Sequence, residues 1–391
     1  MMIMHCASRL HGSGVAMVAA LCAAAASAGA PAAADAGGSA ALYMRWGAEA
    51  LEATDKYLSG TPPFLYAEKT DLPRTDNASV EPAFMWACGI QLTALAAAAR
   101  CGHPGAAERV EQFLRTFDHY WISKDGLGGY NPGPGAAQPD RYYDDNAWIV
   151  LALLEIREQT TDPLTLARAA ELHRFVMSGE DRVLGGGIYW REKDCASKHT
   201  CSNAPVACAA LRLHQMTGRP EHLAEGRRLY DWMRARLLAP DNLYYDNIRP
   251  PDIIEKTKWS YNAALMIRAG LLLHEITGDP RYRDEALATA RAAEAHWVRA
   301  DTGAIACEAS FAHLLCEAFL HTGRATGDPR WAAIVGRALR HLHDHARDPA
   351  GLYPSRWDAE TTAPLTQVRL LDMASASRAY WIAAVFELGR D

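Results

Sequence analysis

A turn signature recurs along this chain, and it constrains the fold more than any other feature. Short segments that combine Gly or Asp with proline end at Pro104, Pro163, Pro220, Pro280 and Pro329, so they recur every 49 to 60 residues. Glycine suits the left-handed residue that closes a helix, and proline suits the first turn of the next helix. We therefore interpret each signature as a tight turn between two helices.

The segments on the two sides of these turns differ in character. After a turn, apolar residues recur at helical spacing with charges between them, as in residues 110–121. Before a turn, the segments are apolar nearly all round, as in residues 147–154 and 206–211. Amphipathic helices cover a core and all-apolar helices lie inside it. With an initial outer helix at residues 43–57, the chain is predicted to be all-α, an (α/α)6 barrel of six inner and six outer helices forming one domain over residues 40–391.

The long connections of this barrel all run from an outer helix to an inner helix. They must therefore lie at one end, where the inner helices begin, which we call the mouth. Loops gathered at one end of a rigid scaffold commonly carry function. These loops are rich in tryptophan and tyrosine beside Asp and Asn, which favours a sugar-binding site over loops packed by their own aromatic residues. The connections are residues 59–83, 122–143, 179–202, 238–260, 299–310 and 347–373.

The first residues form a separate segment. A small apolar run at residues 15–26 follows basic residues and precedes an Ala-x-Ala sequence at residues 26–28. The run is shorter than the roughly 20 apolar residues that a spanning helix needs. We expect residues 1–34 to be a signal peptide and flexible N-terminus, and the mature protein to be exported, monomeric and without a membrane span. The net charge of -6 provides no basic field for nucleic acid.

The sharpest chemical feature is the pair Asp144 and Asp145, which opens the second inner helix at the mouth between Tyr143 and Asn146. Glycoside hydrolysis needs two carboxyl groups in different protonation states. Adjacent carboxylates help because repulsion between like charges raises one pKa, and a helix N-terminus favours the ionised partner. From this pair alone, a helix cap followed by an acidic first turn is the favoured explanation of the residues.

Other inner-helix starts add weight to the chemical interpretation. Trp190 precedes a segment with Asn203 at the third inner helix, and Asp246 and Trp259 precede Asn262 at the fourth. Caps are expected at every helix, but aromatic residues clustered beside them are not.

Four segments in order resemble glycoside hydrolase family 76, the endo-α-1,6-mannanases. They are Tyr-Asp-Asp-Asn-Ala-Trp from residue 143, Gly-Gly-Ile-Tyr-Trp from 186, Ser-Asn-Ala-Pro from 202 and Trp-Ser-Tyr-Asn from 259. The resemblance covers essentially the whole mature chain, and its fold is the barrel already inferred. It implies a retaining mechanism with Asp144 as nucleophile and Asp145 as acid/base. It also implies that a mannose-containing glycan contacts the substrate-binding residues Tyr143, Asn146, Trp190, Asn203, Asp246, Trp259, Tyr261 and Asn262.

Two alternatives to mannan hydrolysis remain open. A transglycosylase of the same family would resolve the same intermediate with a sugar hydroxyl. A sugar epimerase on a helical barrel would be expected to place histidines at the mouth, where only His199 is found. The family pattern continues Tyr-Asn with Gln-Gly, whereas Ala263 and Ala264 follow here, so we expect a subsite or the preferred glycan to differ from the family pattern.

The sequence indicates no cofactor and no metal site, because no zinc-type spacing of Cys and His occurs. Cys195 and Cys201 flank a short polar loop and are candidates for a disulfide. Spacing alone leaves the geometry of that bridge open.

Overall fold

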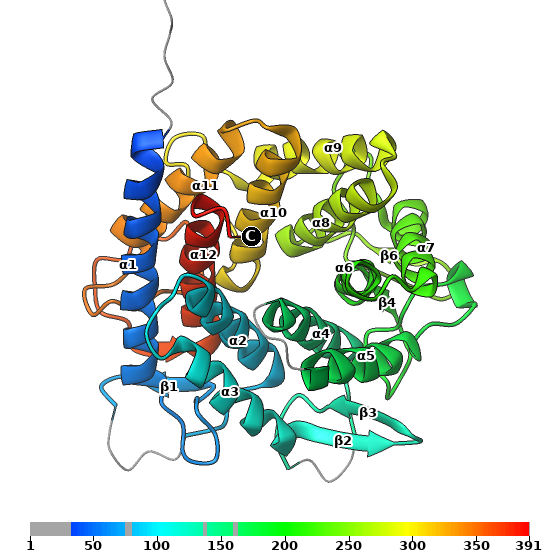
Figure 1. Ribbon diagram of the computed structural model, residues 1–391, viewed down its shortest axis with the longest axis horizontal. Helices are drawn as coiled ribbons and strands as arrows, with labels where there is room; N and C mark the ends of the chain where they lie inside the picture. Colours follow the sequence, from blue (N-terminus) through cyan, green and yellow to red (C-terminus); the bar gives the residue numbers. More distant parts are fainter. Residues whose placement is uncertain (1–32, 75–79, 136–138, 159–162, 391) are drawn as a thin grey trace, which may run out of the picture.

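The computed structural model describes residues 33–74, 80–135, 139–158 and 163–390. Within these ranges, helices of two kinds alternate along the chain (Figure 1). The outer helices are α1 (Ala33–Leu58), α3 (Ala106–Phe117), α5 (Pro163–Met177), α7 (Pro220–Leu237), α9 (Pro280–Trp297) and α11 (Arg330–His341). The inner helices are α2 (Met85–Arg100), α4 (Tyr143–Arg157), α6 (Thr200–Thr217), α8 (Ser260–Thr277), α10 (Ala309–Thr326) and α12 (Leu370–Glu387).

The inner helices close into a ring. Each packs against the next inner helix, and α12 packs back against α2, while each also contacts an outer helix. Burial follows the predicted division, since α12 is buried from Leu370 to Val385 whereas α3 buries one face with Val110, Phe113 and Phe117. The predicted (α/α)6 barrel is confirmed.

The recurrent turn has a defined chemistry at each of its residues. Beside Gly278, which has a φ of 71°, the Thr277 hydroxyl donates to the carbonyl of Leu273 over 2.6 Å. The Asp279 side chain accepts from the backbone N–H of Arg281 and so caps α9, whose first residue is Pro280. The same set of contacts recurs at Thr326 to Arg330. These turns end an inner helix and start an outer one within three residues, which places every short turn at the end away from the mouth.

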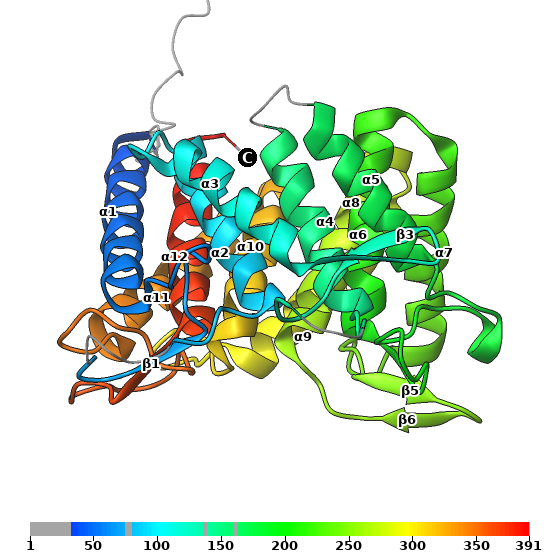
Figure 2. The same cartoon turned by 90° about the horizontal axis from the view of Figure 1, so that it is seen from below.

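The mouth connections carry short strands that the sequence did not predict. Strand β1 (Lys69–Asp71) pairs with β7 (Gln367–Arg369), which joins the first connection to the last. Strands β4 (Lys198–His199), β5 (Asn247–Arg249) and β6 (Ile253–Glu255) form a second antiparallel sheet, and β5 and β6 are visible at the lower edge of Figure 2. Strands β2 (Trp121–Lys124) and β3 (Leu127–Tyr130) form a hairpin whose β3 lies against α5. Short helical turns complete these connections: η1 (Asp118–Tyr120), η2 (Val183–Gly185) and η3 (Leu342–Ala346).

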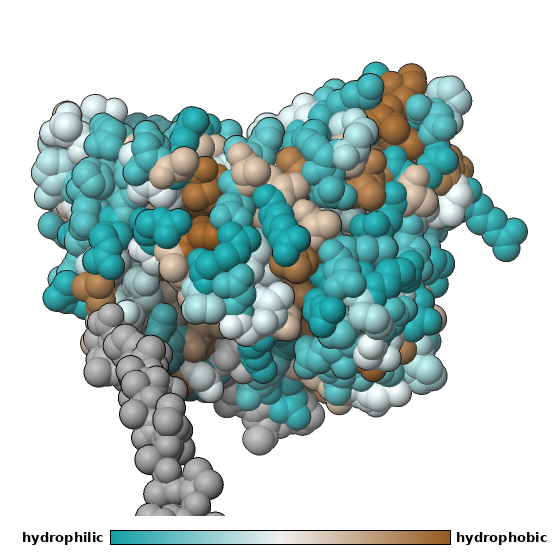
Figure 3. All heavy atoms as spheres, turned by 90° about the horizontal axis from the view of Figure 1, so that it is seen from above, coloured by the Kyte–Doolittle hydropathy of each residue, from teal (hydrophilic) through white to brown (hydrophobic). Residues whose placement is uncertain are grey.

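The same end of the molecule lies along the upper edge of Figure 3, which is notched between two raised shoulders. Hydrophilic side chains cover most of the face shown there. Because the paired strands brace the connections on both sides, they position the residues at the starts of the inner helices.

The predicted signal peptide falls almost entirely on residues outside the described ranges. The first outer helix starts at Ala33 and is longer than the predicted segment 43–57. Searching the described helices for a segment long and apolar enough to cross a membrane finds none.

Candidate functional site

Asp144 and Asp145 occupy the first turn of α4, at the mouth. The Asp144 Oδ2 atom accepts a hydrogen bond of 2.8 Å from the indole Nε1 of Trp190, and the thiol of Cys201 lies 3.5 Å from the same oxygen. Its Oδ1 atom accepts from the backbone N–H of Asp145 at 3.0 Å. Residues from three segments thus converge on one carboxyl group.

The two carboxyl groups have unequal surroundings. Burial raises the pKa of Asp144 to about 6, while the hydrogen bonds from Trp190 and Asp145 oppose that rise by favouring the ionised form. Burial raises the pKa of Asp145 well above its usual range, and the charge of neighbouring Asp144 raises it further. Asp145 therefore keeps its proton to higher pH than Asp144 does. Acid-assisted nucleophilic attack needs two carboxyl groups that differ in this direction.

Two asparagines hold the neighbouring loops against the inner helices. Asn146 accepts from the backbone N–H of Tyr130 and donates to the carbonyls of Tyr130 and Tyr142. Asn203 repeats this arrangement with the backbone of Ile188 and the carbonyl of His199. Both side chains are fully buried. Their polar atoms are committed to the backbone, so these two predicted substrate contacts position the loops that carry Tyr142 and Trp190.

Replacing Asn203 by alanine should destabilise the protein without touching either aspartate. Three hydrogen bonds to buried backbone would be lost, at a cost of about 2–3 kcal/mol in the free energy of unfolding. Urea unfolding measures this change. Asn247→Ala is the matched control, because the partly exposed Asn247 donates one bond to Asp246. An equal loss in both variants would contradict the positioning role.

Aromatic rings flank the aspartates on one side. Trp190 stacks on His199 with ring centroids 5.2 Å apart. The rings of Tyr142 and Trp190 meet edge to face, with centroids 5.0 Å apart. The Trp190 side chain remains 36% exposed. The indole is thus held with its N–H on the Asp144 carboxylate and part of its surface open to solvent.

A second aromatic cluster lies across α8 and α10. Tyr261 stacks on Phe311 with centroids 4.2 Å apart, and Trp259 packs on the same ring at 5.5 Å. Trp86, at the start of α2, also stacks on Phe311, with ring centroids 6.0 Å apart. Sequence reasoning predicted Trp259 and Tyr261 but missed Phe311 and Trp86. Their positions at the starts of inner helices were the available signal.

The remaining predicted contacts differ in their surroundings. The Tyr143 ring stacks on Phe175 and is buried, so it belongs to the wall of the barrel. Asp246 accepts from Asn247 at 2.9 Å, and its Oδ2 lies 3.8 Å from His199 Nδ1. Asn262 is buried, and neither its Oδ1 nor its Nδ2 has a hydrogen-bond partner within the described residues. Unlike the other two asparagines, it retains its full bonding capacity.

The disulfide suggested by the sequence is not formed. Cys195 is exposed in its loop, whereas Cys201 is buried in the first turn of α6. The Cys201 thiol lies against Asp144, and the Cys195 thiol lies 3.7 Å from the carbonyl oxygen of Glu192. The two side chains therefore have different partners, and the Cys201 thiol lies beside the Asp144 carboxylate.

One group in the described part of the chain has ligands of the kind that metals prefer. His173 of α5 and His222 of α7 each place a ring nitrogen 3.0 Å from the same Glu225 oxygen. The carboxylate is already satisfied by the two imidazoles. These residues lie on outer helices and include neither aspartate, so they form no part of the site at the mouth.

Comparison with known proteins identifies a family and several relatives. The family model described as "Glycosyl hydrolase family 76" matches residues 51–348, which is more than half of the chain. Over 159 residues, the chain is 26% identical to "Mannan endo-1,6-alpha-mannosidase DCW1" of Candida glabrata, a match covering 36% of this chain. The match spans only about a third, 35%, of that relative's own length.

Solved structures agree over nearly the whole barrel. A family 76 α-mannanase of Bacteroides thetaiotaomicron is 29% identical, with a TM-score of 0.82, and the match covers 89% of this chain and 96% of that one. A second structure is an α-1,6-mannanase of Salegentibacter sp. HEL1_6, in which an inactive variant with two consecutive aspartates changed to asparagine binds α-1,6-mannotriose. It is 22% identical with a TM-score of 0.74 over 88% of this chain and 99% of that one, which shows the shared fold.

Proposed function

The chain belongs to glycosyl hydrolase family 76, and from this premise we propose that it hydrolyses α-1,6-mannosidic bonds in a mannan-type glycan. The observation that carries the proposal is the aspartate pair at the mouth, in which Asp144 accepts hydrogen bonds from Trp190 and Asp145, and the pKa of Asp145 is raised by burial and by the charge of Asp144. Relatives whose names describe mannan cleavage support the substrate class.

The proposed reaction assigns one step to each aspartate. The Asp144 carboxylate attacks the anomeric carbon while Asp145 gives its proton to the departing glycosidic oxygen. Asp145 then accepts a proton from water, which attacks the covalent glycosyl ester and releases a product of retained configuration. The two hydrogen bonds of Asp144 to Trp190 and its own helix favour the ionised nucleophile. A change of two consecutive aspartates in the inactive Salegentibacter variant is consistent with this pair being the reactive one.

The residues around the pair take supporting roles in this proposal. Trp190 and the cluster of Trp259, Tyr261 and Phe311 offer ring faces to sugars, since aromatic surfaces pair well with the apolar faces of pyranose rings. Asp246 and Asn262 supply hydrogen bonds to hydroxyl groups. We further propose that residues 1–34 include a signal peptide that exports the protein. Mannan-type glycans occur outside the cytoplasm, so export brings the protein to its substrate.

Changing Trp190 to phenylalanine should move the acidic limb of the pH profile. The nucleophile must be ionised, so kcat/KM falls as the pH drops through the pKa of Asp144, near 6. Loss of the indole N–H removes a bond that favours the carboxylate, which raises that pKa and shifts the limb to higher pH. Trp121→Phe, on the hairpin beside α5, is the matched control. An unshifted limb would contradict the role of the indole.

Product chromatography tests the proposed reaction. The mature protein should convert linear α-1,6-mannan into a ladder of short oligosaccharides and leave β-1,4-mannan intact. Products longer than a supplied oligosaccharide would identify a transglycosylase instead. Absence of any cleavage by the folded protein would overturn the mannanase assignment.

A further inference from the structure

A second pocket occupies the interior of the barrel, away from the aspartates. All six inner helices line it, and its volume is about 620 Å³, within the range of small-molecule sites. Its lining starts one helical turn beyond the pair, at Trp148 of α4, and continues to Arg100 and Arg324 near the far ends of α2 and α10. Neither Asp144 nor Trp190 lines it. The pocket therefore opens at the end opposite the mouth.

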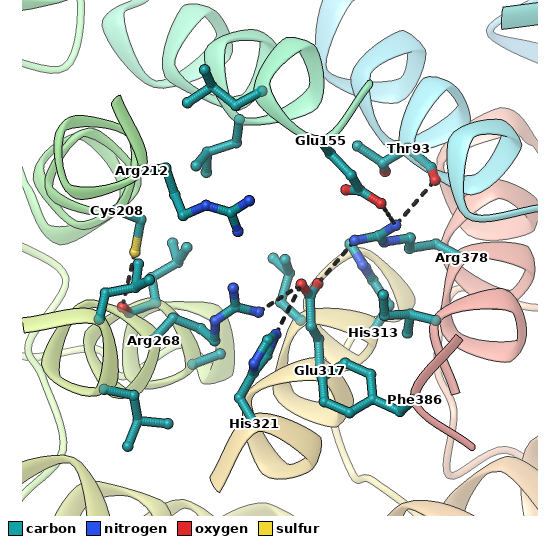
Figure 4. Close-up of a pocket in the computed structure, with 18 of the residues that line it drawn as sticks. Thr93, Glu155, Cys208, Arg212, Arg268, His313, Glu317, His321, Arg378 and Phe386 are labelled. Atoms are coloured by element: carbon teal, nitrogen blue, oxygen red, sulfur yellow. Dashed lines mark hydrogen bonds and ion pairs between the residues drawn. The ribbon is translucent and has the colours of Figure 1, made fainter. Parts of the chain in front are cut away.

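Charged side chains meet inside this pocket (Figure 4). Arg268 Nη1 lies 2.7 Å from Glu317, and Arg378 lies 2.5 Å from Glu155 and 3.3 Å from Glu317. Glu317 is thus shared by two guanidinium groups, and their charges hold its pKa well below the usual range despite its burial. Across the pocket lining, arginine side chains outnumber glutamates.

Two of the lining arginines, Arg212 and Arg268, lie close enough for their charges to repel one another. These residues come from neighbouring helices, α6 and α8, and Figure 4 shows Arg212 reaching into the open interior of the pocket. Arg212 pairs with Glu158 toward the far end. Burial and the nearby charge of Arg268 lower the pKa of Arg212, while the charges of Glu155, Glu317 and Glu275 oppose that fall. An oxyanion between two guanidinium groups would relieve that repulsion and accept bidentate hydrogen bonds.

The floor of the pocket holds an unpartnered polar group. His313 of α10 lines the pocket and is 3% exposed, and neither of its ring nitrogens has a hydrogen-bond partner within the described residues. Burial and the charge of Arg378 lower the pKa of His313 to about 3, so the ring is neutral at physiological pH. A buried neutral imidazole with both nitrogens unsatisfied is costly, and a bound polar group would satisfy it.

Apolar side chains form much of the remaining wall, among them Leu271, Leu272 and Phe386. The rim is open, because Gln215 and Ala325 are exposed to solvent. The combination of an open rim, apolar walls and facing guanidinium groups fits a molecule with two unlike parts.

From this arrangement we propose that the barrel interior binds an amphipathic organic anion. Its carboxylate or phosphate head lies between Arg212 and Arg268, and its apolar body lies against Leu272 and Phe386. This site is separate from the glycan site and does not depend on the proposed hydrolysis. Binding there is expected to proceed whether or not the protein cleaves mannan.

Isothermal titration calorimetry with three probes tests this proposal. Sodium decanoate has both the head and the apolar body, octyl glucoside has an uncharged head, and sodium acetate has no apolar body. All three are used below micelle-forming concentrations with the full mature protein. We expect decanoate to bind at least tenfold more tightly than either of the others, and mannotriose not to compete with it.

Three variants place the binding in this pocket. Arg212→Gln removes one side of the head site, and Ala325→Trp obstructs the exposed rim; each should raise the Kd for decanoate at least tenfold. Arg219→Gln removes an exposed arginine just after α6 and should leave the Kd unchanged. The proposal would be overturned if decanoate failed to bind the folded wild type. It would also be overturned if the Kd for decanoate were the same in Arg212→Gln as in the wild type, or if octyl glucoside bound the wild type as tightly as decanoate. Phosphate-headed decyl chains, tested beside decanoate, then decide which oxyanion is preferred.

Discussion

Replacing Asp144 by asparagine should lower kcat for mannan cleavage by a factor on the order of 10,000, because the amide cannot form the glycosyl ester. Asp145→Asn should lower kcat by about 100- to 10,000-fold for a substrate with a poor leaving group, since the general acid is lost. Initial rates of reducing-sugar release measure both. Asp252→Asn, an exposed change in the β5–β6 hairpin region, should leave kcat unchanged.

The same Asp144 variant should be more stable than the wild type at neutral pH. The folded-state pKa of Asp144 is raised, so folding favours the protonated form and ionisation of this group costs stability above pH 6. As the pH falls from 6 toward the ordinary aspartate pKa of about 4, that cost declines and the advantage of asparagine shrinks with it. Melting temperatures from pH 8 to pH 5 measure the difference. Retained activity in the variant, or a destabilisation that grows above pH 6, would contradict the account of the pair.

Replacing Arg378 by methionine should destabilise the barrel strongly. The Arg378 side chain is 5% exposed and compensates two carboxylates, Glu155 and Glu317, from the interior of α12. Removing one partner of a buried ion network leaves uncompensated charge, which costs about 3–5 kcal/mol of unfolding free energy. Urea unfolding at neutral pH measures this loss.

Two further variants show whether charge causes that effect. Arg330→Met breaks a surface pair with Glu294 and should cost less than about 1 kcal/mol. Adding Glu317→Gln to Arg378→Met should restore part of the stability, because it removes one uncompensated charge. No recovery in the double variant would mean that lost packing, and not charge, explains the effect of Arg378→Met.

The barrel could be predicted from the sequence because its determinants are local. The four residues of a Thr-Gly-Asp-Pro turn are enough to determine its conformation. The contrast between an all-apolar helix and an amphipathic one indicates which of the two lies inside. The strands could not be predicted, because they span two to four residues and depend on pairing between distant loops, as in β1 with β7. Short segments of this kind carry no periodicity of their own.

The roles of the site residues stay a prediction, and the structure adds where each of them lies. Asp144, Asp145 and Trp190 lie together at the mouth, as the motifs indicated. Asn146 and Asn203 belong to the same motifs, but their side chains hydrogen-bond to the backbone of neighbouring loops. The sequence alone cannot distinguish this role of an asparagine at a helix start from contact with a ligand. The interior pocket was missed entirely. Isolated charged residues within otherwise apolar inner helices, such as Arg212 and Arg268, were the sequence feature that could have indicated this pocket.

Chemical rescue with azide tests the central claim, the division of roles between the two aspartates. The measurement uses an aryl α-mannoside donor with a good leaving group, and NMR reads the configuration of the glycosyl azide formed. With Asp145→Ala, azide should replace water at the glycosyl ester and give the α-azide. With Asp144→Ala, azide should attack directly and give the β-azide. The opposite pairing of variants and products would contradict the assignment of Asp144 as nucleophile and Asp145 as acid/base.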